Sequence, residues 1–537
     1  MTMWNGAKRA SRNRRLTMLA GFLLASPAIL QAQQAPKPAP ASAPTKFEIN
    51  EYLVRGNTLL DSVDIESAVE PFLGPDRSLD DVHAARDALQ KLYQAKGFQS
   101  VVVEVPPQQV KGGVLLLQVA ENHIGRMRVE GAKYHSPQAI RDAVPSLAEG
   151  SVPNFTKVQQ ELTDLNRQPG QQVVPLLSPG SLPQTIDVTL KVDDSYPLHG
   201  SVEINNDHSA DTPDLRTIAN VRYDNLWQLG HTISASYIVA PQDRHATEVY
   251  ALSYLAPLSS TWSLLGSGYK SNSNANTLGG TTVLGKGTSF SLQATRQLPS
   301  VGQYTQSVSF GISRKHFEQN ITFDGKTLEA PLTYAPLTIS YNGQRASEKS
   351  STDFSLAGTF GSRGVGSDNL AFDNQRYNAR DNFAYLRADF DYTRTYAGGY
   401  ALVVRASGQA AASPLVSSEQ FAAGGESSVR GYLSAENTGD NGAQASLELR
   451  SPSVASWLGS FVDDWRFHFF MDGSRVLLID PLPGQHGRFT LLSTGVGTRF
   501  TVFRDINGQL EYAYPLREGT QTRLHDGHLL FSLKAGL

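Results

Sequence analysis

Residues 465–472 read Trp-Arg-Phe-His-Phe-Phe-Met-Asp. Successive side chains of a β-strand point to opposite faces of the sheet. One face would therefore carry only large apolar side chains, and the other would be mixed and mostly polar. The apolar set is Trp465, Phe467, Phe469 and Met471, and the opposite set is Arg466, His468, Phe470 and Asp472. A strand between lipid and a watery lumen has this alternation, which predicts a transmembrane β-barrel.

The same alternation of apolar and polar residues extends over the C-terminal two-thirds of the chain. We predict sixteen strands between residues 198 and 537, including 303–315 and 330–341. Strands of roughly 10 residues and an even strand number are typical of bacterial outer-membrane barrels. Long Gly/Ser/Asn-rich connections (271–285, 362–381 and 412–442) alternate with short ones such as 396–398. A soluble β-sandwich is the alternative, but it does not explain a wholly apolar outer face.

The N-terminus indicates export. Five basic residues between Lys8 and Arg15 precede an apolar run from Leu16 to Leu30. Residues 1–32 are predicted to be a secretory signal peptide. A single membrane anchor is less consistent, because the run is shorter than about 18 residues and Ser26-Pro27 interrupts it. Residues 33–45 form a Pro/Ala linker.

Composition and short motifs limit the binding partners and catalytic activities that can be expected of the chain. The net charge of −3 gives no basic footprint for nucleic acid. The chain has no cysteine, which excludes disulfides and thiolate metal sites. The segment Gly280–Gly287 nearly matches a phosphate-binding loop, but Ser/Thr is missing after Lys286 and the context is a hairpin. No Gly-x-Ser-x-Gly or His-Glu-x-x-His motif occurs, so neither an enzyme nor a cofactor or metal site is expected.

Between the linker and the barrel, one pattern occurs twice. Residues 46–121 are expected to form strand, helix, helix, strand, strand, and residues 122–194 repeat that order. The first strands end similarly, at Val54-Arg55-Gly56 and Val129-Glu130-Gly131. Two α+β units of about 70 residues are therefore predicted, rather than one larger domain.

The longest connection, about 412–442, contains Phe421-Ala422-Ala423-Gly424-Gly425 followed by Val429-Arg430-Gly431-Tyr432. A loop of this length in a barrel protein is usually functional, and Arg430 needs a partner where water is scarce. Asp472, on the lumen face of the thirteenth predicted strand, is a candidate for a bidentate bridge. Glu448 and Asp389 are further possible lumen partners. A solvated loop with an incidental arginine, and a hydrated lumen carboxylate, are the alternatives.

These motifs resemble those of the two-partner secretion transporters (TpsB proteins), the outer-membrane exporters of filamentous haemagglutinins and haemolysins. The resemblance rests on Val429–Tyr432 after the Phe-x-x-Gly-Gly lead-in, on Phe470-Met471-Asp472, and on Asn205–His208 at the end of the first barrel strand. In the repeats it rests on Val54–Thr58 and Leu165–Gly170, which are similar to the family's POTRA modules.

The resemblance implies α+β POTRA modules followed by an all-β sixteen-stranded barrel (195–537) in the outer membrane of a Gram-negative bacterium. The POTRA modules would be periplasmic and capture a large exoprotein in unfolded form. The family's sixth extracellular loop folds into the lumen, and its arginine bonds the strand aspartate. By position these roles fall on Arg430 and Asp472, with Val429, Gly431, Tyr432 and Phe470 supporting them. Whether the chain also activates its cargo stays open.

Three features depart from the family pattern. The family's Phe-x-Asp-x-Gly appears as Phe470-Met471-Asp472-Gly473-Ser474, so its glycine is displaced by one position. Many relatives carry a plug helix before the first POTRA module, and only the Pro/Ala linker is available here. The chain ends in Leu537 instead of an aromatic residue, so Phe531 and Leu533 would have to serve the barrel-assembly machinery.

Three other functions compete with export. A barrel-assembly insertase shares the arginine loop but usually has more POTRA modules. A barrel protease or phospholipase would need clustered Ser, His and Asp at the rim, which the sequence lacks. A plain porin leaves the two N-terminal units unexplained. Export of a haemagglutinin-, haemolysin- or adhesin-type protein through the barrel is therefore the leading prediction.

Overall fold

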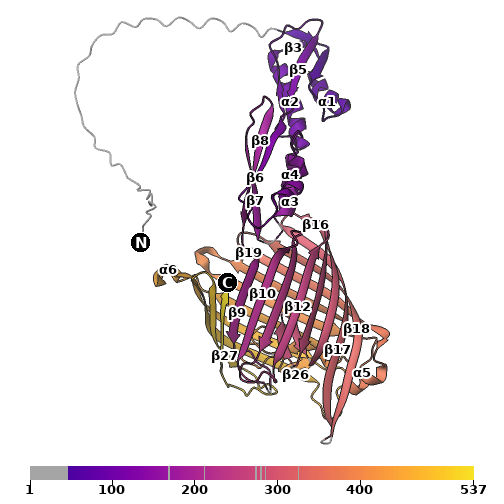
Figure 1. Cartoon of the computed structure of the whole chain (residues 1–537), viewed down its shortest axis with the longest axis vertical. Coiled ribbons are helices and arrows are strands. Elements are labelled where there is room, and N and C mark those ends of the chain that lie inside the picture. Colours follow the sequence, from indigo (N-terminus) through magenta and orange to yellow (C-terminus); the bar gives the residue numbers. More distant parts are fainter. Residues whose placement is uncertain are drawn as a thin grey trace, which may run out of the picture.

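The computed structural model describes residues 46–536, except 167, 169, 211, 273, 274, 279, 280, 285, 324 and 325. The expected signal peptide, the Pro/Ala linker and Leu537 lie outside the described residues, as do parts of the Leu165–Gly170 and Gly280–Gly287 motifs. Two small α+β units form a stalk at one end of a β-barrel (Figure 1). Among the described residues, no helix is both long and apolar enough to cross a membrane.

The first unit has a three-stranded sheet in the order β2-β5-β4, with β2 and β5 parallel. Helix α2 covers this sheet through Val82, Ala85, Leu89 and Tyr93, all of which are buried. The helix begins at a capping box, in which Ser78 and Asp81 bond each other's backbone N–H groups. The elements are β1 (Phe47–Ile49), β2 (Glu51–Arg55), α1 (Ser62–Val69), η1 (Glu70–Phe72), β3 (Gly74–Arg77), α2 (Leu79–Ala95), β4 (Val102–Glu104) and β5 (Val114–Ala120).

The second unit repeats this arrangement, with sheet order β6-β8-β7 and a parallel β6–β8 pair. Its elements are β6 (His123–Glu130), α3 (Pro137–Asp142), η2 (Pro145–Leu147), α4 (Phe155–Leu165), β7 (Gln171–Pro179) and β8 (Thr185–Asp194). Each unit has its own buried apolar cluster. The strand and helix order expected for both repeats is present, with the short pair β1–β3 added in the first.

Sixteen antiparallel strands close into a barrel, and the last strand pairs with the first. They are β9 (Leu198–Asn205), β10 (Arg216–Leu226), β11 (His231–Val239), β12 (Glu248–Pro257), β13 (Trp262–Ser271), β16 (Lys286–Val301), β17 (Tyr304–Phe323), β18 (Lys326–Ala346), β19 (Ser350–Gly366), β20 (Ala384–Thr395), β21 (Ala401–Ala411), β24 (Asn441–Arg450), β25 (Val462–Leu477), β26 (Arg488–Val502), β27 (Ile506–Pro515) and β28 (His528–Gly536).

The alternation along β25 matches the prediction from its sequence. Phe467 and Phe469 on the outer face are 53% and 50% exposed, whereas His468, Phe470 and Asp472 on the inner face are at most 5% exposed. The exposed outer side chains would be covered by lipid, because the apolar band of such a barrel lies in the membrane.

Strand lengths and two long connections differ from the predictions. Strands β17 and β18 are 20 and 21 residues long and form an extended hairpin, where 303–315 and 330–341 were expected. The segment 271–285 holds a small hairpin of β14 (Ala275–Leu278) and β15 (Thr281–Leu284). The segment 362–381 contains helix α5 (Asn369–Gln375). Membrane thickness does not limit strands outside the bilayer, so alternation alone could not find their ends.

The β10–β11 turn of the barrel contacts residues 134–136 of the second unit, a segment to which Asp194 also bonds. Asp194, the last residue of β8, accepts hydrogen bonds from the backbone N–H groups of Lys133, Tyr134 and His135, at 2.8 to 3.1 Å. Gln228, in the β10–β11 turn, accepts one from the backbone N–H of Ser136 at 3.0 Å. Burial raises the pKa of the Asp194 carboxyl, but these three donors outweigh it and hold the pKa below its ordinary value.

Candidate functional site

The connection between β21 and β24 folds along the inner wall of the barrel. It contains η4 (Ser417–Glu419) and a small hairpin of β22 (Phe421–Ala423) with β23 (Asn437–Gly439). The hairpin side chains pack in an apolar cluster with Val476 of β25 and Leu491 of β26. Val429 and Tyr432 belong to the same cluster and are 0% and 3% exposed. The loop predicted at 412–442 is thus an ordered element inside the lumen.

Arg430 lies at the tip of this loop and is 2% exposed. Its guanidinium makes a bidentate bridge to Asp472, with Nε 2.7 Å from Oδ2 and Nη2 2.9 Å from Oδ1. The backbone N–H of Arg430 donates to the same Oδ2 at 3.2 Å. Three donors from one residue therefore converge on a carboxylate that is 1% exposed. A charge-assisted fork of this kind fixes both position and orientation.

The other donors of Arg430 reach two more carboxylates. Nη1 is 2.8 Å from Glu448 Oε2 and 3.1 Å from Glu511 Oε1, and Nη2 is 3.2 Å from Ser446 Oγ. Strands β24, β25 and β27 each contribute one acid. Glu448 was expected as a possible partner and is one. Asp389 is not: it lies on β20 and lines a separate pocket with residues of β17–β19, so that alternative was wrong.

Arg450, Arg499 and His468 also contact the carboxylates of this cluster. Arg450 Nε is 2.6 Å from Glu448 Oε1, and Arg499 Nη2 is 3.4 Å from both Glu448 and Glu511. His468 Nε2 is 2.7 Å from Glu511 Oε1. Three arginines thus face three buried carboxylates; Arg430 is buried with them, whereas the side chains of Arg450 and Arg499 are 24% and 29% exposed. Buried charges are tolerated only when they are paired in this way.

Phe470 forms the floor under the guanidinium. The Arg430 Cζ atom lies 3.5 Å from the centroid of the Phe470 ring, and the ring is fully buried. Stacking of this kind contributes up to about 2 kcal/mol when it is desolvated. The ring has room because residue 495 of the next strand is glycine, where a Cβ would come within 2.4 Å of Phe470 Cζ.

The residues after Arg430 turn the chain and bind it to the wall. Gly431 has φ +88°, and a Cβ there would lie 3.1 Å from Ala513 Cβ, so both backbone conformation and space favour glycine. The Tyr432 hydroxyl is 2.8 Å from the carbonyl oxygens of Leu492 and Arg517. Each of the four residues from Val429 to Tyr432 therefore has a separate contact.

A second anchor holds the beginning of the loop against the opposite wall. Glu419 is 2% exposed and accepts from Lys315 of β17 at 2.5 Å and from the Tyr385 hydroxyl of β20 at 2.7 Å. Tyr334 of β18 bonds the same carboxylate. The loop therefore spans the lumen between two charged clusters. Sequence reasoning did not identify Glu419, because nothing local distinguishes it from a solvated loop acid.

The end of β9 forms a third contact with the loop. Asp207 Oδ1 accepts from the backbone N–H of Glu426 at 3.2 Å, and the backbone N–H of Ser434 donates to the His208 carbonyl at 2.8 Å. The resemblance had singled out Asn205–His208 without giving them a role. Their position links the barrel's closing seam to the lumen loop.

The cluster also has the residue types of a cation site. Glu448, His468 and Glu511 each place a ligand atom within 4.8 Å of the others. In the described structure, the Arg430 and Arg499 guanidinium groups already bond these carboxylates. A guanidinium is therefore the cation that this set of acids holds. Arginines that bond carboxylates in this way fix the relative positions of the groups they join.

A sixteen-stranded barrel that carries POTRA-type units and is filled by an arginine-tipped loop defines a class of outer-membrane protein. Comparison with known families agrees. Residues 184–500 match the family described as haemolysin secretion/activation protein ShlB/FhaC/HecB, and residues 47–122 match the POTRA domain of ShlB type. The chain belongs to this haemolysin secretion/activation family, whose members are outer-membrane transporters with periplasmic POTRA domains.

Two relatives are outer membrane transporters named CdiB. The one from Dickeya dadantii (strain 3937) is 25% identical over 415 residues, covering 75% of this chain and 72% of its own length. The one from Escherichia coli is 28% identical over 160 residues, covering 30% of this chain and 27% of its own. The second match thus spans only about a quarter of that relative.

Solved structures show the same fold. CdiB from Escherichia coli has a TM-score of 0.67 at 20% identity and covers 94% of this chain and 93% of its own. BamA from Haemophilus ducreyi lacking POTRA domains 1–3 has a TM-score of 0.55 at 13% identity, covering 91% of this chain and all of that one.

Proposed function

We propose that this protein secretes a large exoprotein partner by the two-partner route. The periplasmic POTRA units bind the partner in an unfolded state, and the barrel conducts it across the outer membrane. The observation that carries the proposal is the lumen loop, which lies inside the pore and is held by non-covalent contacts alone: ion pairs, hydrogen bonds and one apolar cluster. A loop held by ion pairs and hydrogen bonds can leave the pore, whereas a folded plug domain would have to unfold.

The first step requires a surface that accepts an extended chain of almost any sequence. An exposed sheet edge does this, because backbone hydrogen bonds supply most of the affinity. Strand β7 is an edge of the second unit and is nine residues long. Its Val174 and Leu176 are 47% and 53% exposed, so the edge also offers apolar contacts. We infer that β7 pairs with the incoming partner.

The driving force would then come from the partner, which folds after it emerges and cannot slide back. The protein itself does not act as an enzyme in this scheme, and it needs no cofactor. For its own assembly in the membrane, the barrel would depend on recognition of its last strand, β28, by the barrel-assembly machinery.

An insertase for other barrels is the second candidate, favoured by the likeness of the fold to BamA. That likeness is one of fold alone at this identity. Two POTRA units and the family match both favour secretion.

Depletion of the protein distinguishes the two. We expect the exoprotein encoded by the neighbouring reading frame to disappear from the medium while other outer-membrane barrels keep their abundance. Loss of the other barrels with normal secretion of the exoprotein would refute the proposal.

Capture by β7 has its own test, since the chain contains no cysteine. A single cysteine at Leu176 should cross-link to cysteines spread along a stalled partner, and one at Gln160 on the exposed side of α4 should not. Equal cross-linking at both positions would contradict capture by the edge strand.

A further inference from the structure

A large groove lies on the outer wall of the barrel, away from the lumen loop. It crosses β12, β13, β16 and β17 and has a volume of about 960 Å³. Its sides are bulky apolar side chains that face away from the lumen, among them Leu252, Phe290 and Ile312, which are 54%, 66% and 50% exposed. Ligand pockets for small molecules typically have volumes of about 300–1,000 Å³.

The floor of the groove is made by glycine. On β13, Gly266 and Gly268 lie opposite Tyr254 and Leu252 of β12, and opposite Leu292 and Phe290 of β16. Because cross-strand partners share a face, the two glycines sit between two rows of large side chains. The space above Gly266 is open, with no atom within 4 Å of a Cβ built there, whereas the Phe290 ring lies over Gly268, with its Cδ1 2.8 Å from such a Cβ. The resulting channel has the shape and polarity for acyl chains.

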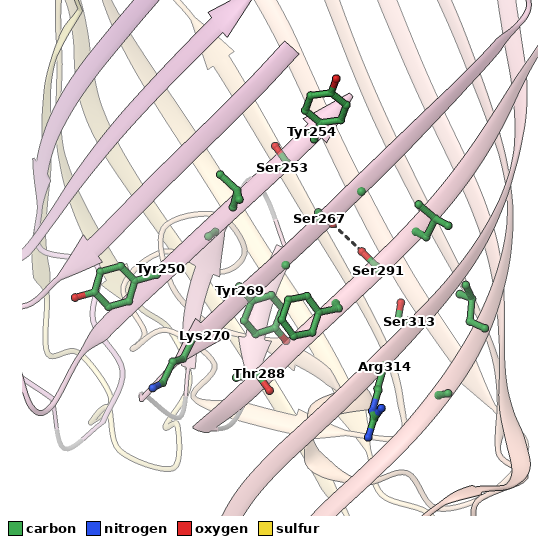
Figure 2. A pocket seen from close by; sticks show the side chains of 18 residues that line it. Tyr250, Ser253, Tyr254, Ser267, Tyr269, Lys270, Thr288, Ser291, Ser313 and Arg314 are labelled. Atoms are coloured by element: carbon green, nitrogen blue, oxygen red, sulfur yellow. Dashed lines mark hydrogen bonds between the residues drawn. The ribbon is translucent and has the colours of Figure 1, made fainter. Parts of the chain in front are cut away.

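Two cations lie together at one end of this groove. Figure 2 shows Lys270, Thr288 and Arg314 at the same end, with Tyr254 at the other. Lys270 pairs with Thr288, and Thr288 pairs with His316, two residues beyond Arg314. Adjacent strands are about 4.8 Å apart and Arg314 is offset by two residues of about 3.4 Å each, so the backbones of the two basic residues are about 12 Å apart along the wall. Both side chains are exposed, and neither forms an ion pair among the described residues.

The surrounding charges leave an excess of positive charge. Glu318, near His316, pairs in register with Lys286. Glu248, on β12, is bonded to Arg244 and to two tyrosine hydroxyls. These two acids therefore have basic neighbours of their own, and none of the acids whose side chains the structure describes forms an ion pair with Lys270 or Arg314.

Strand direction places this cationic end on the outer side of the membrane. The POTRA units precede β9, so β9 starts on the periplasmic side, and antiparallel pairing makes β13 and β17 run outward as well. Lys270 is the next-to-last residue of β13. The cations therefore lie at the level of the headgroups of the outer leaflet, and the groove extends below them into the acyl region.

We propose that this groove binds a phosphorylated, multiply acylated glycolipid of the outer leaflet, of the lipid A type. Lys270 and Arg314 contact its phosphates, Thr288 offers a hydroxyl between them, and the glycine-floored channel takes acyl chains. Arginine and lysine are the residues that bind phosphate in proteins. The spacing of the two cations suits a headgroup with two phosphates better than a glycerophospholipid with one.

The test uses the purified full-length protein in detergent, titrated with diphosphoryl lipid A and observed by native mass spectrometry. We expect a one-to-one adduct that weakens at least tenfold in the double variant K270A/R314A. The variant G266L fills the channel without a backbone clash and should also weaken the adduct. The matched control is R296A. Arg296 lies on β16, one of the strands that line the groove, but at its periplasmic end, where its Cζ atom is 5.7 Å from the centroid of the Trp262 ring.

Two comparisons identify the lipid. Monophosphoryl lipid A should bind the wild-type protein more weakly than diphosphoryl lipid A does. The two lipids should bind K270A/R314A with the same affinity. Phosphatidylglycerol should not displace diphosphoryl lipid A at equal concentration. Displacement by phosphatidylglycerol would mean a general lipid surface and would overturn the proposal, as would unchanged binding in K270A/R314A. Heat-modifiable migration on gels shows that each variant is a folded barrel.

Discussion

Replacement of Arg430 by alanine is the most informative perturbation, because its cost can be worked out contact by contact. Five side-chain hydrogen bonds are lost, at 2.7 to 3.2 Å. Glu448 keeps Arg450 and Arg499, and Glu511 keeps His468 and Arg499. Within the described part of the chain, Asp472 keeps only the backbone N–H of residue 430 as a donor. The penalty therefore falls mainly on one stranded, buried carboxylate.

Stranding one partner of a buried ion pair costs about 3–5 kcal/mol. At 1.4 kcal/mol per factor of ten, docking of the loop should weaken by roughly 100- to several thousand-fold. If the free energy of the docked loop lies below that of the undocked loop by less than this penalty, R430A will populate an open pore. The expected results are higher conductance in planar bilayers and reduced secretion of the partner.

Loop position can be measured directly by thiol labelling. Ser434 is 7% exposed, so a cysteine at this position should react slowly with a maleimide in the otherwise cysteine-free chain. Labelling should become fast in R430A and stay slow in R475A, since Arg475 is an exposed arginine only three residues from Asp472.

The double variant R430A/D472N tests the mechanism itself. It removes the stranded charge, so labelling should be slower than in R430A alone, as a double-mutant cycle would show. Equal labelling in R430A and R475A would refute the lock, and a double variant as open as R430A would refute its electrostatic origin.

Three further predictions follow from other contacts. E419Q removes the charge partner of Lys315, whose side chain is 20% exposed, and should raise pore conductance, and K315M/E419Q should restore it; a conductance unchanged in E419Q would contradict the second anchor. G431A should lower the temperature of heat-modifiable unfolding, because a positive φ costs a non-glycine residue about 1–2 kcal/mol and the methyl group meets Ala513; an unchanged temperature would contradict this. The lowered pKa of Asp194 means that its bonds to the backbone of residues 133–135 stabilise that segment of the second unit at neutral pH and are lost as the pH falls through the folded pKa. The mobility of a spin label on a cysteine at position 133 should therefore rise below about pH 4, while in D194N it should be the same at all pH values.

Local pattern was sufficient for the fold class. Alternation along β25 predicted which residues face outward, because a strand has a period of two whatever it pairs with. The βααββ order of the two N-terminal units was visible for a similar reason, since helix periodicity and turn residues are local. The long hairpin β17–β18 and helix α5 were missed because they lie beyond the membrane, where the apolar band no longer sets strand length.

The candidate site was only partly accessible from the sequence. Arg430 and Asp472 were singled out by a resemblance to a family. Glu448 and Asp389 were both candidates for a further partner of Arg430, and the sequence could not distinguish between them. Only the barrel's register decided between them: β24 and β25 are neighbours, whereas Asp389 lies on β20, two strands from β24 around the wall.

By itself, the sequence determined the alternation of each strand, the two N-terminal repeats and the presence of a glycine-rich loop with one arginine. The tertiary structure decided which acids surround that arginine, where Glu419 anchors, and that Gly266 of β13 leaves an open space between large side chains on the outer wall. The physical reason is that side-chain direction follows from local backbone geometry, whereas the closing of a barrel brings together residues from distant strands whose spacing no local pattern records.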